Sequence, residues 1–196
     1  MWRKDDPVYK KAKAEGYRSR AAFKLKELNN SYHIIKEGNR VVDLGCAPGG
    51  WMQYTMEVIG AEGTLVGIDL QEIKPLPFPN AFFIKADIND PSVVQKIEEL
   101  LHGRADVVLS DISPKLTGIR DRDMEEARRL WVSILNITKQ ILKRDGNFLM
   151  KAFYSDELKE FVEKIRSMFL FFKITRPDAT RKASSEVYLV GKGFID

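Results

Sequence analysis

The chain has 196 residues, of which 44% are hydrophobic, and a formal net charge of +4 at pH 7. A chain of this length and composition can bury one sizeable hydrophobic core, so we expect a single domain over residues 1–196. No apolar run reaches the roughly 20 residues of a membrane span, the N-terminus lacks the apolar stretch of a signal peptide, and one cysteine excludes an internal disulfide. These features predict a cytoplasmic protein with no membrane partner.

The N-terminal segment is strongly basic. Residues 1–26 contain nine Lys and Arg against three acids, a net charge of +6, which leaves the rest of the chain near −2. A basic arm on a near-neutral body is typical of nucleic-acid binding, although a solvated terminus explains it equally well. Tyr9, Tyr17 and Phe23 are interleaved with these charges and could stack on bases, and Phe23 could equally belong to the core.

The expected elements begin with an arm and helix over residues 1–30. Residues 1–17 are predicted to be irregular or loosely helical, and Ser19 can cap a helix that runs to about Asn29. From residue 38 onward strands and helices alternate. Strands are predicted near 40–44, 64–69, 81–85, 105–110 and 146–152, and helices near 50–59, 91–101, 124–143 and 156–168.

This alternation is typical of βαβ units, so the fold class is predicted as α/β, with a mostly parallel sheet and helices on both faces over residues 38–196. The end of the chain differs from the rest. Two strands near 171–176 and 186–190 are separated only by a loop, which leaves no room for a crossover helix. The last pair of strands should therefore be antiparallel.

Residues 41–51, Val-Val-Asp-Leu-Gly-Cys-Ala-Pro-Gly-Gly-Trp, have the pattern of a buried strand that ends in a tight loop and opens a helix. Such a loop, at the end of the first strand of an open α/β sheet, is where nucleotide-like cofactors bind. Its spacing matches neither the Gly-x-Gly-x-x-Gly fingerprint nor a P-loop. Asp43 would repel a pyrophosphate but accept a hydrogen bond from an amino group. The loop therefore favours S-adenosylmethionine over NAD.

Two further acids follow the next two predicted strands. Asp69 lies in the window where a carboxylate binds ribose hydroxyls, and Asp87 could accept from an adenine amino group. One strand-end acid alone is more often a turn residue, but three in succession beside a glycine loop favour cofactor contacts. Cys46 is interpreted as a small buried filler. The two histidines lack metal-ligand spacing, so no metal is expected.

Charged residues also follow the fourth and fifth strands. Asp111 comes directly after Val107–Ser110, and Lys151 directly after Phe148–Met150, so both reach the rim that carries the cofactor loop. Glu186 opens the last strand, and Lys24 lies on the N-terminal helix. Surface ion pairing is a plausible alternative for Lys24 but not for the two residues at strand ends.

These motifs resemble the FtsJ/RrmJ family of ribose 2′-O-methyltransferases. The resemblance covers nearly the whole chain and rests on residues 18–25, 43–51, 111–114, 151 and 185–188. It implies a Rossmann-like sheet of seven strands whose last strand is antiparallel, with S-adenosylmethionine as the cofactor. The implied catalytic residues are Lys24, Asp111, Lys151 and Glu186. With the loop included, the expected cofactor-binding residues are Asp43, Gly45, Pro48, Gly49, Gly50, Trp51, Asp69, Asp87 and Asp111.

The same resemblance implies RNA as the substrate. A uridine of large-subunit ribosomal RNA, free or in the subunit, is favoured, with the tRNA anticodon loop second. A non-catalytic RNA-binding relict is a third possibility, which an intact set of four catalytic residues disfavours. The basic arm and residues 176–182 offer RNA contacts, and a monomer is expected. Lys151 is expected to steer the attacking hydroxyl and stabilise its developing charge.

Overall fold

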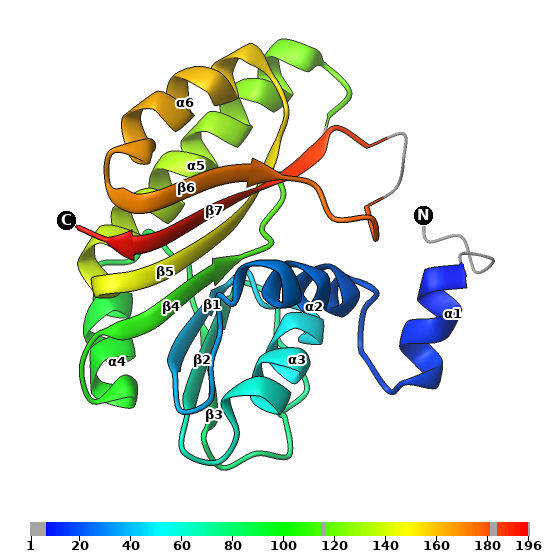
Figure 1. Cartoon of the computed structure of the whole chain (residues 1–196), viewed down its shortest axis with the longest axis vertical. Coiled ribbons are helices and arrows are strands. Elements are labelled where there is room, and N and C mark those ends of the chain that lie inside the picture. The colour runs from blue at the N-terminus through cyan, green and yellow to red at the C-terminus, as the bar shows by residue number, and fades with distance from the viewer. Residues whose placement is uncertain (1–6, 115–116, 181–183, 196) are drawn as a thin grey trace.

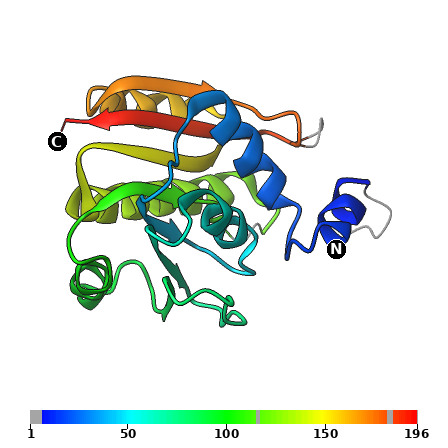
Figure 2. The ribbon, with the colours of Figure 1, turned by 60° about the horizontal axis from the view of Figure 1, so that its bottom comes forward.

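The computed structural model describes residues 7–114, 117–180 and 184–195. A sheet runs through the molecule between two layers of helices, with the N-terminal helix α1 set to one side (Figures 1 and 2). In chain order the elements are α1 (Pro7–Ala14), α2 (Ala21–Tyr32), β1 (Arg40–Leu44), α3 (Gly50–Ile59), β2 (Thr64–Asp69), β3 (Ala81–Lys85), α4 (Ser92–Leu101), β4 (Ala105–Ser110), α5 (Arg120–Ile141), β5 (Leu142–Phe153), α6 (Asp156–Arg166), β6 (Phe169–Thr175) and β7 (Glu186–Phe194).

The sheet has the order β3-β2-β1-β4-β5-β7-β6. Strands β1 to β5 pair in parallel, whereas β7 lies antiparallel between β5 and β6. The predicted α/β class and the antiparallel end of the chain are therefore confirmed. The strand order reverses between β1 and β4, and in open α/β sheets the carboxyl ends of the strands at such a reversal are where ligands bind.

Both faces of the sheet are buried, which explains why its central strands are almost continuously apolar. Val41 of β1 and Val107 of β4 belong to the core beneath α2 and α3. The next residues along the same strands, Val42 and Val108, belong to the core beneath α4, α5 and α6. Successive side chains of a strand point to opposite faces, so this register is fixed by two separate cores.

The last strand, expected to end at 190, continues to Phe194. Two other predicted boundaries were also wrong. The helix expected over 124–143 begins at Arg120, where the Asp123 carboxylate accepts hydrogen bonds from the backbone N–H groups of Thr117 (2.6 Å) and Gly118 (3.0 Å) in the preceding loop. The strand expected from 146 begins at Leu142, because Leu142 already pairs with Ala105 before the register shifts. Both errors concern polar segments whose conformation depends on contacts outside the local sequence.

Two of the N-terminal aromatic residues, Tyr17 and Phe23, pack within the protein. Tyr17 is buried, donates its hydroxyl hydrogen bond to Glu57 (2.7 Å) and packs edge-on against Phe23 at 5.6 Å. The expectation that Tyr17 stacks on bases is therefore wrong, because its ring is covered. The first six residues of the basic arm, and residues 181 and 182 of the predicted contact segment, lie outside the described residues.

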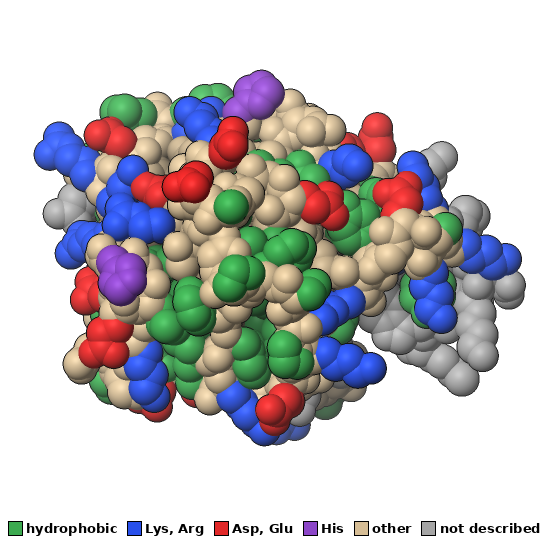
Figure 3. Space-filling model, turned by 90° about the horizontal axis from the view of Figure 1, so that it is seen from below, with side chains coloured by type: hydrophobic (Ala, Val, Ile, Leu, Met, Phe, Trp, Pro, Cys, Tyr) green, Lys and Arg blue, Asp and Glu red, His purple; other side chains and the backbone are tan. Residues whose placement is uncertain are grey.

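Strand β3 forms the edge of the sheet at the bottom of Figure 1. Seen from that side, hydrophobic side chains gather in the middle of the surface, and Lys and Arg side chains lie around them at both the left-hand and the right-hand ends (Figure 3). Over the ranges that the structure describes, no helix is both long and apolar enough to cross a membrane.

Candidate active site

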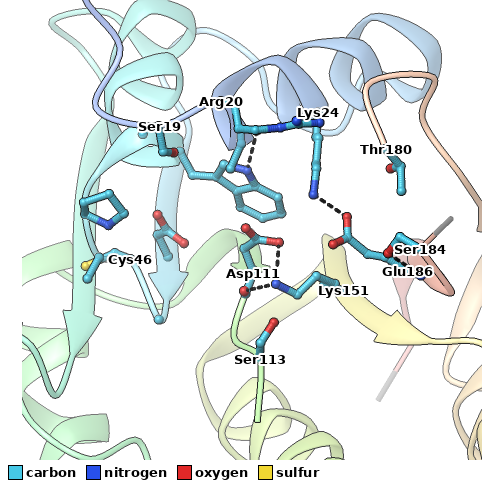
Figure 4. A pocket seen from close by; sticks show the side chains of 17 residues that line it. Ser19, Arg20, Lys24, Cys46, Asp111, Ser113, Lys151, Thr180, Ser184 and Glu186 are labelled. Atoms are coloured by element: carbon cyan, nitrogen blue, oxygen red, sulfur yellow. Dashed lines mark hydrogen bonds and ion pairs between the residues drawn. The ribbon is translucent and has the colours of Figure 1, made fainter. Parts of the chain in front are cut away.

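A cavity of about 630 Å³ opens at the carboxyl ends of β1 and β4, at the reversal of strand order. Its walls come from the start of α2, the loop between β1 and α3, the ends of β4 and β5, and the start of β7 (Figure 4). The predicted site residues among its lining residues are Lys24, Asp43, Gly45, Pro48, Gly50, Trp51, Asp111, Lys151 and Glu186.

The four predicted catalytic side chains meet in this cavity as two ion pairs. Lys24 from α2 donates to Glu186 at the start of β7. The Lys151 ammonium lies 3.1 Å from the Asp111 carboxylate and donates to the Asp111 backbone carbonyl at 2.6 Å. All four side chains are largely shielded from solvent. Residues from four separate elements thus form one compact polar cluster.

The β5–β7 register explains why three of these groups are neighbours. Lys151 lies directly opposite Tyr188 in the antiparallel pair, and Glu186 is two residues before Tyr188 on the same strand. Residues two apart on a strand share a face. Glu186 and Tyr188 are therefore presented beside Lys151 on the face that α2 covers, where Lys24 approaches.

Tyr188 joins the two ion pairs and is a site residue that the sequence interpretation did not select. Its hydroxyl lies 3.0 Å from the Asp111 carboxylate and 3.0 Å from the Glu186 carboxylate. Burial, followed by the charges of these two acids, raises the pKa of the Tyr188 phenol well above its usual range. The tyrosine is therefore a neutral donor shared between two carboxylates. Its position two residues after Glu186 on a strand was a signal that could have identified it.

Glu186 is held in its charged form. Burial by itself would raise the pKa of this carboxyl, but the charge of Lys24, together with hydrogen bonds from Lys24 and Tyr188 and the charge of Lys151, outweighs burial and lowers the pKa. A carboxylate that remains ionised keeps the Lys24 ammonium fixed in the cavity wall.

Asp43 differs from the other acids because nothing in the described part of the chain compensates its charge. It is fully buried at the end of β1, and neither carboxylate oxygen has a hydrogen-bond partner among the described residues. Burial, then the negative charges of Asp111 and Asp69, raises the pKa of Asp43 well above its usual value. An unpaired buried carboxylate in a cavity wall is a binding site for a cationic or hydrogen-bond-donating ligand group.

The loop after β1 can be built only with glycine at two positions. Gly45 has φ +74°, and a Cβ there would lie 2.0 Å from the Ile112 side chain. Gly49 has φ +104°, and a Cβ there would lie 2.8 Å from the Arg18 guanidinium. That guanidinium donates to the Pro48 carbonyl of the loop (3.5 Å) and to the carbonyls of Lys74 (2.6 Å) and Pro75 (2.9 Å), so Arg18 connects the cofactor loop to the segment after β2.

We expect Gly45→Ala to destabilise the protein more than Gly38→Ala does. The two glycines have nearly equal φ, +74° and +75°, but a Cβ at Gly38 would meet nothing within 4 Å. Gly38→Ala should lower the free energy of unfolding by ~1 kcal/mol through backbone strain, and Gly45→Ala by ~3 kcal/mol because overpacking adds to it. Urea unfolding of both variants measures the difference. Equal losses would show that Ile112 moves aside at no cost.

The remaining predicted cofactor residues are not among those lining the cavity. Asp69 supports the loop, because its carboxylate accepts hydrogen bonds from the backbone N–H groups of Ala47 and Gln71, both at 2.8 Å. Asp87 is exposed and accepts from the backbone N–H of Asn89 at 2.8 Å within its own turn. Gly49 is the N-cap of α3. The structure therefore brings six of the nine predicted cofactor residues to the cavity and places these three outside its wall.

Ser19 was predicted to cap α2, and this was wrong. Arg20 occupies the N-cap position, without a side-chain cap hydrogen bond, and Ser19 is buried in the cavity wall beside Gly50. Arg20, Ser113 and Ser184 also line the cavity and were not selected as site residues from sequence, whereas Thr180, which lines it too, lies in the segment 176–182 that was predicted to contact RNA. Cys46 is buried, as expected of a filler, and burial raises the pKa of its thiol.

A ligand cavity at the β1–β4 reversal of a seven-stranded sheet with an antiparallel β7 defines the Rossmann-like methyltransferase class. Solved structures agree with this class. Fibrillarin from Aeropyrum pernix in complex with natively bound S-adenosyl-L-methionine has a TM-score of 0.61 at 18% identity, over 89% of this chain and 75% of that one. The chain belongs to the FtsJ-like methyltransferase family, whose model matches residues 17–194.

Relatives within the family match this chain over almost its whole length. Ribosomal RNA large subunit methyltransferase E of Methanothermobacter thermautotrophicus is 48% identical over 98% of this chain and 91% of its own. The protein of the same name from Methanocaldococcus jannaschii is 44% identical over 99% and 80%. A crystal structure of a ribosomal RNA methyltransferase from Plasmodium falciparum has a TM-score of 0.81 at 30% identity, over 91% of this chain and 99% of that one.

Proposed function

We propose that this protein transfers a methyl group from S-adenosylmethionine to the ribose 2′-oxygen of a uridine in large-subunit ribosomal RNA. The observation that carries the proposal is the convergence of Lys24, Asp111, Lys151 and Glu186 in one cavity that also contains the unpaired Asp43 carboxylate. The names of the curated relatives support ribosomal RNA as the substrate.

The residues present fit S-adenosylmethionine. The Asp43 carboxylate has no hydrogen-bond donor among the described residues, and the ammonium group of the cofactor would supply one. The loop around Gly45 exposes backbone without side chains, and Trp51 forms a wall fixed by its indole N–H, which donates to the Ala21 carbonyl at 2.9 Å. When bound, S-adenosylmethionine supplies an electrophilic methyl group. Asp43, Gly45, Pro48, Gly50 and Trp51 would hold it, with Asp111 between it and the lysines.

Lys151 is oriented toward the ribose that would accept the methyl group. An ammonium group has three N–H donors, and Asp111 provides two acceptors for them, its carboxylate and its backbone carbonyl. Among the described residues, this leaves one N–H of Lys151 to donate to the ribose 2′-oxygen. A donor placed there stabilises the negative charge that develops on that oxygen as it loses its proton.

Lys24 and Glu186 keep the part of the cavity that would receive the ribose, its acceptor end, polar and ordered. Because Tyr188 hydrogen-bonds both carboxylates, the two ion pairs form one network rather than two independent contacts. The network places the lysines before substrate arrives, so the reaction requires little reorganisation of charge.

The basic N-terminal segment supports an RNA substrate. Lys10, Lys11 and Lys13 are exposed on α1, which stands beside the molecule close to the start of α2 (Figures 1 and 3). Cationic side chains of this kind neutralise backbone phosphates and strengthen binding in a salt-dependent manner. RNA that enters the cavity past α2 would meet these charges first.

The test is transfer of a tritiated methyl group from S-adenosylmethionine to ribosomal subunits, naked ribosomal RNA and bulk tRNA. We expect label as 2′-O-methyluridine in subunits or ribosomal RNA, and no label with the Lys151→Ala variant. Label found only in tRNA would replace the proposed substrate. Tight cofactor binding with no label in any RNA would contradict the proposed activity.

A further inference from the structure

Thr180 has a buried hydroxyl that finds no partner within the described ranges of the chain, in the wall of the active-site cavity. The residue is 6% exposed, and its Oγ1 atom makes no hydrogen bond to the residues that the structure describes. It lines the cavity with Lys24, Ser184 and Glu186, and Figure 4 places it on their side, opposite Cys46. An unsatisfied buried hydroxyl is destabilising, so its presence in a cavity indicates a ligand that satisfies it.

The loop that carries Thr180 is fixed by α2. The Glu27 carboxylate accepts hydrogen bonds from the backbone N–H groups of Asp178 (2.6 Å) and Ala179 (3.1 Å), and Arg20 donates to the Ala179 carbonyl at 2.7 Å. Thr180 closes the turn by donating its own backbone N–H to Pro177 at 2.9 Å. The orphan hydroxyl is therefore held in place by contacts that do not involve the hydroxyl itself.

One face of α2 positions both the catalytic lysine and this loop. Arg20, Lys24 and Glu27 are four and three residues apart, the spacing of neighbours on a helix surface. Lys24 contacts Glu186, while Arg20 and Glu27 contact the backbone of residues 178–179. The distance between Thr180 and the catalytic cluster is therefore set by a single rigid element.

The position of Thr180 in the cavity indicates what it binds. Cys46, from the loop after β1, lies on one side of Asp111 in Figure 4, whereas Lys24, Glu186 and Thr180 lie on the other, so Thr180 belongs to the end of the cavity that holds the Lys24–Glu186 pair, the acceptor end. In that end the acids are already paired with Lys24 and Lys151. A threonine hydroxyl is a common ligand of nucleic-acid phosphates, and it adds a donor without adding charge.

We propose that Thr180 donates a hydrogen bond to a phosphate oxygen of the RNA strand next to the ribose that is methylated, and that Glu27 positions it. This inference rests on the proposed function, because it assigns a contact to the RNA substrate of that reaction. Thr180 acts on binding and register of the RNA, whereas Lys151 acts on the reacting oxygen.

The test compares Thr180→Val with Thr180→Ser and with Thr55→Val. Thr55 also has a buried hydroxyl without a partner among the described residues, but it lies on α3 and does not line the cavity. We expect Thr180→Val to raise the KM and Kd for ribosomal RNA about tenfold, with unchanged affinity for S-adenosylmethionine and an unchanged or higher Tm. Thr180→Ser should bind RNA like the parent protein, and Thr55→Val should leave RNA binding unchanged.

Glu27→Gln tests the positioning role. If Glu27 acts through Thr180, Glu27→Gln raises the KM for RNA in the parent protein but adds little in the Thr180→Val background. Full additivity would contradict that role. Unchanged RNA affinity in Thr180→Val, or a lower Tm, would overturn the assignment of Thr180. Because RNA binding is measured directly as well as through turnover, a parent protein that binds RNA but transfers no methyl group contradicts the proposed function and not the Thr180 contact.

Discussion

Lys151→Ala should lower kcat by about 10³-fold while the affinities for S-adenosylmethionine and RNA change little. The variant removes the donor that stabilises charge on the reacting oxygen, and loss of one such donor typically costs 10²–10³ in rate. It also leaves Asp111 without its ion pair, which places an uncompensated negative charge beside that oxygen. Single-turnover methyl transfer with saturating substrates measures this effect on the chemical step.

Lys143→Ala is the matched control for this experiment. Lys143 lies on β5 like Lys151, but it pairs with Asp106 near the opposite end of the strand. Arg40 also pairs with Asp106, at 3.6 Å, so removal of Lys143 still leaves that carboxylate with a cationic partner. Parent-like kcat is expected for Lys143→Ala. A loss below tenfold in Lys151→Ala would show that the chemistry does not depend on this ammonium group.

Asp43→Asn should have opposite effects on cofactor binding and on stability. The variant removes the carboxylate that is proposed to bind the ammonium group of the cofactor. We therefore expect the Kd for S-adenosylmethionine to rise about 100-fold, the scale of a lost charge-assisted hydrogen bond. Without cofactor, however, the same variant should be more stable than the parent protein at neutral pH, because the buried Asp43 carboxyl must either keep its proton or ionise without a partner among the described residues, whereas a neutral amide does neither.

The pH dependence identifies the cause of that stability difference. The unfolded chain releases the Asp43 proton near pH 3.8, whereas burial raises the pKa in the folded state. Between these two pKa values the folded protein binds more protons than the unfolded chain, so Asp43 makes the stability fall as the pH rises. The advantage of Asp43→Asn should therefore be absent below about pH 4 and grow as the pH rises above it.

Urea unfolding of both proteins without cofactor, from pH 4 to pH 8, measures this advantage, and calorimetric titration measures the Kd. Bound cofactor should stabilise the parent protein more than the variant, since ligand stabilisation follows affinity. An Asp43→Asn protein that is less stable at every pH, with unchanged affinity, would show that Asp43 has a structural role instead.

Much of this molecule follows from local sequence pattern. Alternating apolar segments predicted the α/β class, and the absence of a helix between 176 and 186 predicted the antiparallel β7, because a parallel connection needs a crossover. Charged residues directly after buried strands, such as Asp111 and Lys151, had to reach one rim of the sheet. These properties depend on the spacing at which apolar side chains recur and on the length of the segments that connect the strands, and both can be read from the sequence.

The sequence alone also determined the glycine loop after β1 and, through family resemblance, the set Lys24, Asp111, Lys151 and Glu186. Tertiary structure decided which residues meet. The β5–β7 register placed Tyr188 between two carboxylates, and packing of α2 on the sheet moved Ser19 from a helix cap into the cavity wall. It also buried Asp43 and Thr180 with side-chain oxygens that have no hydrogen-bond partner in the part of the chain that the structure describes. Burial and hydrogen-bond satisfaction are sums over neighbours distant in sequence, so only the folded chain defines them.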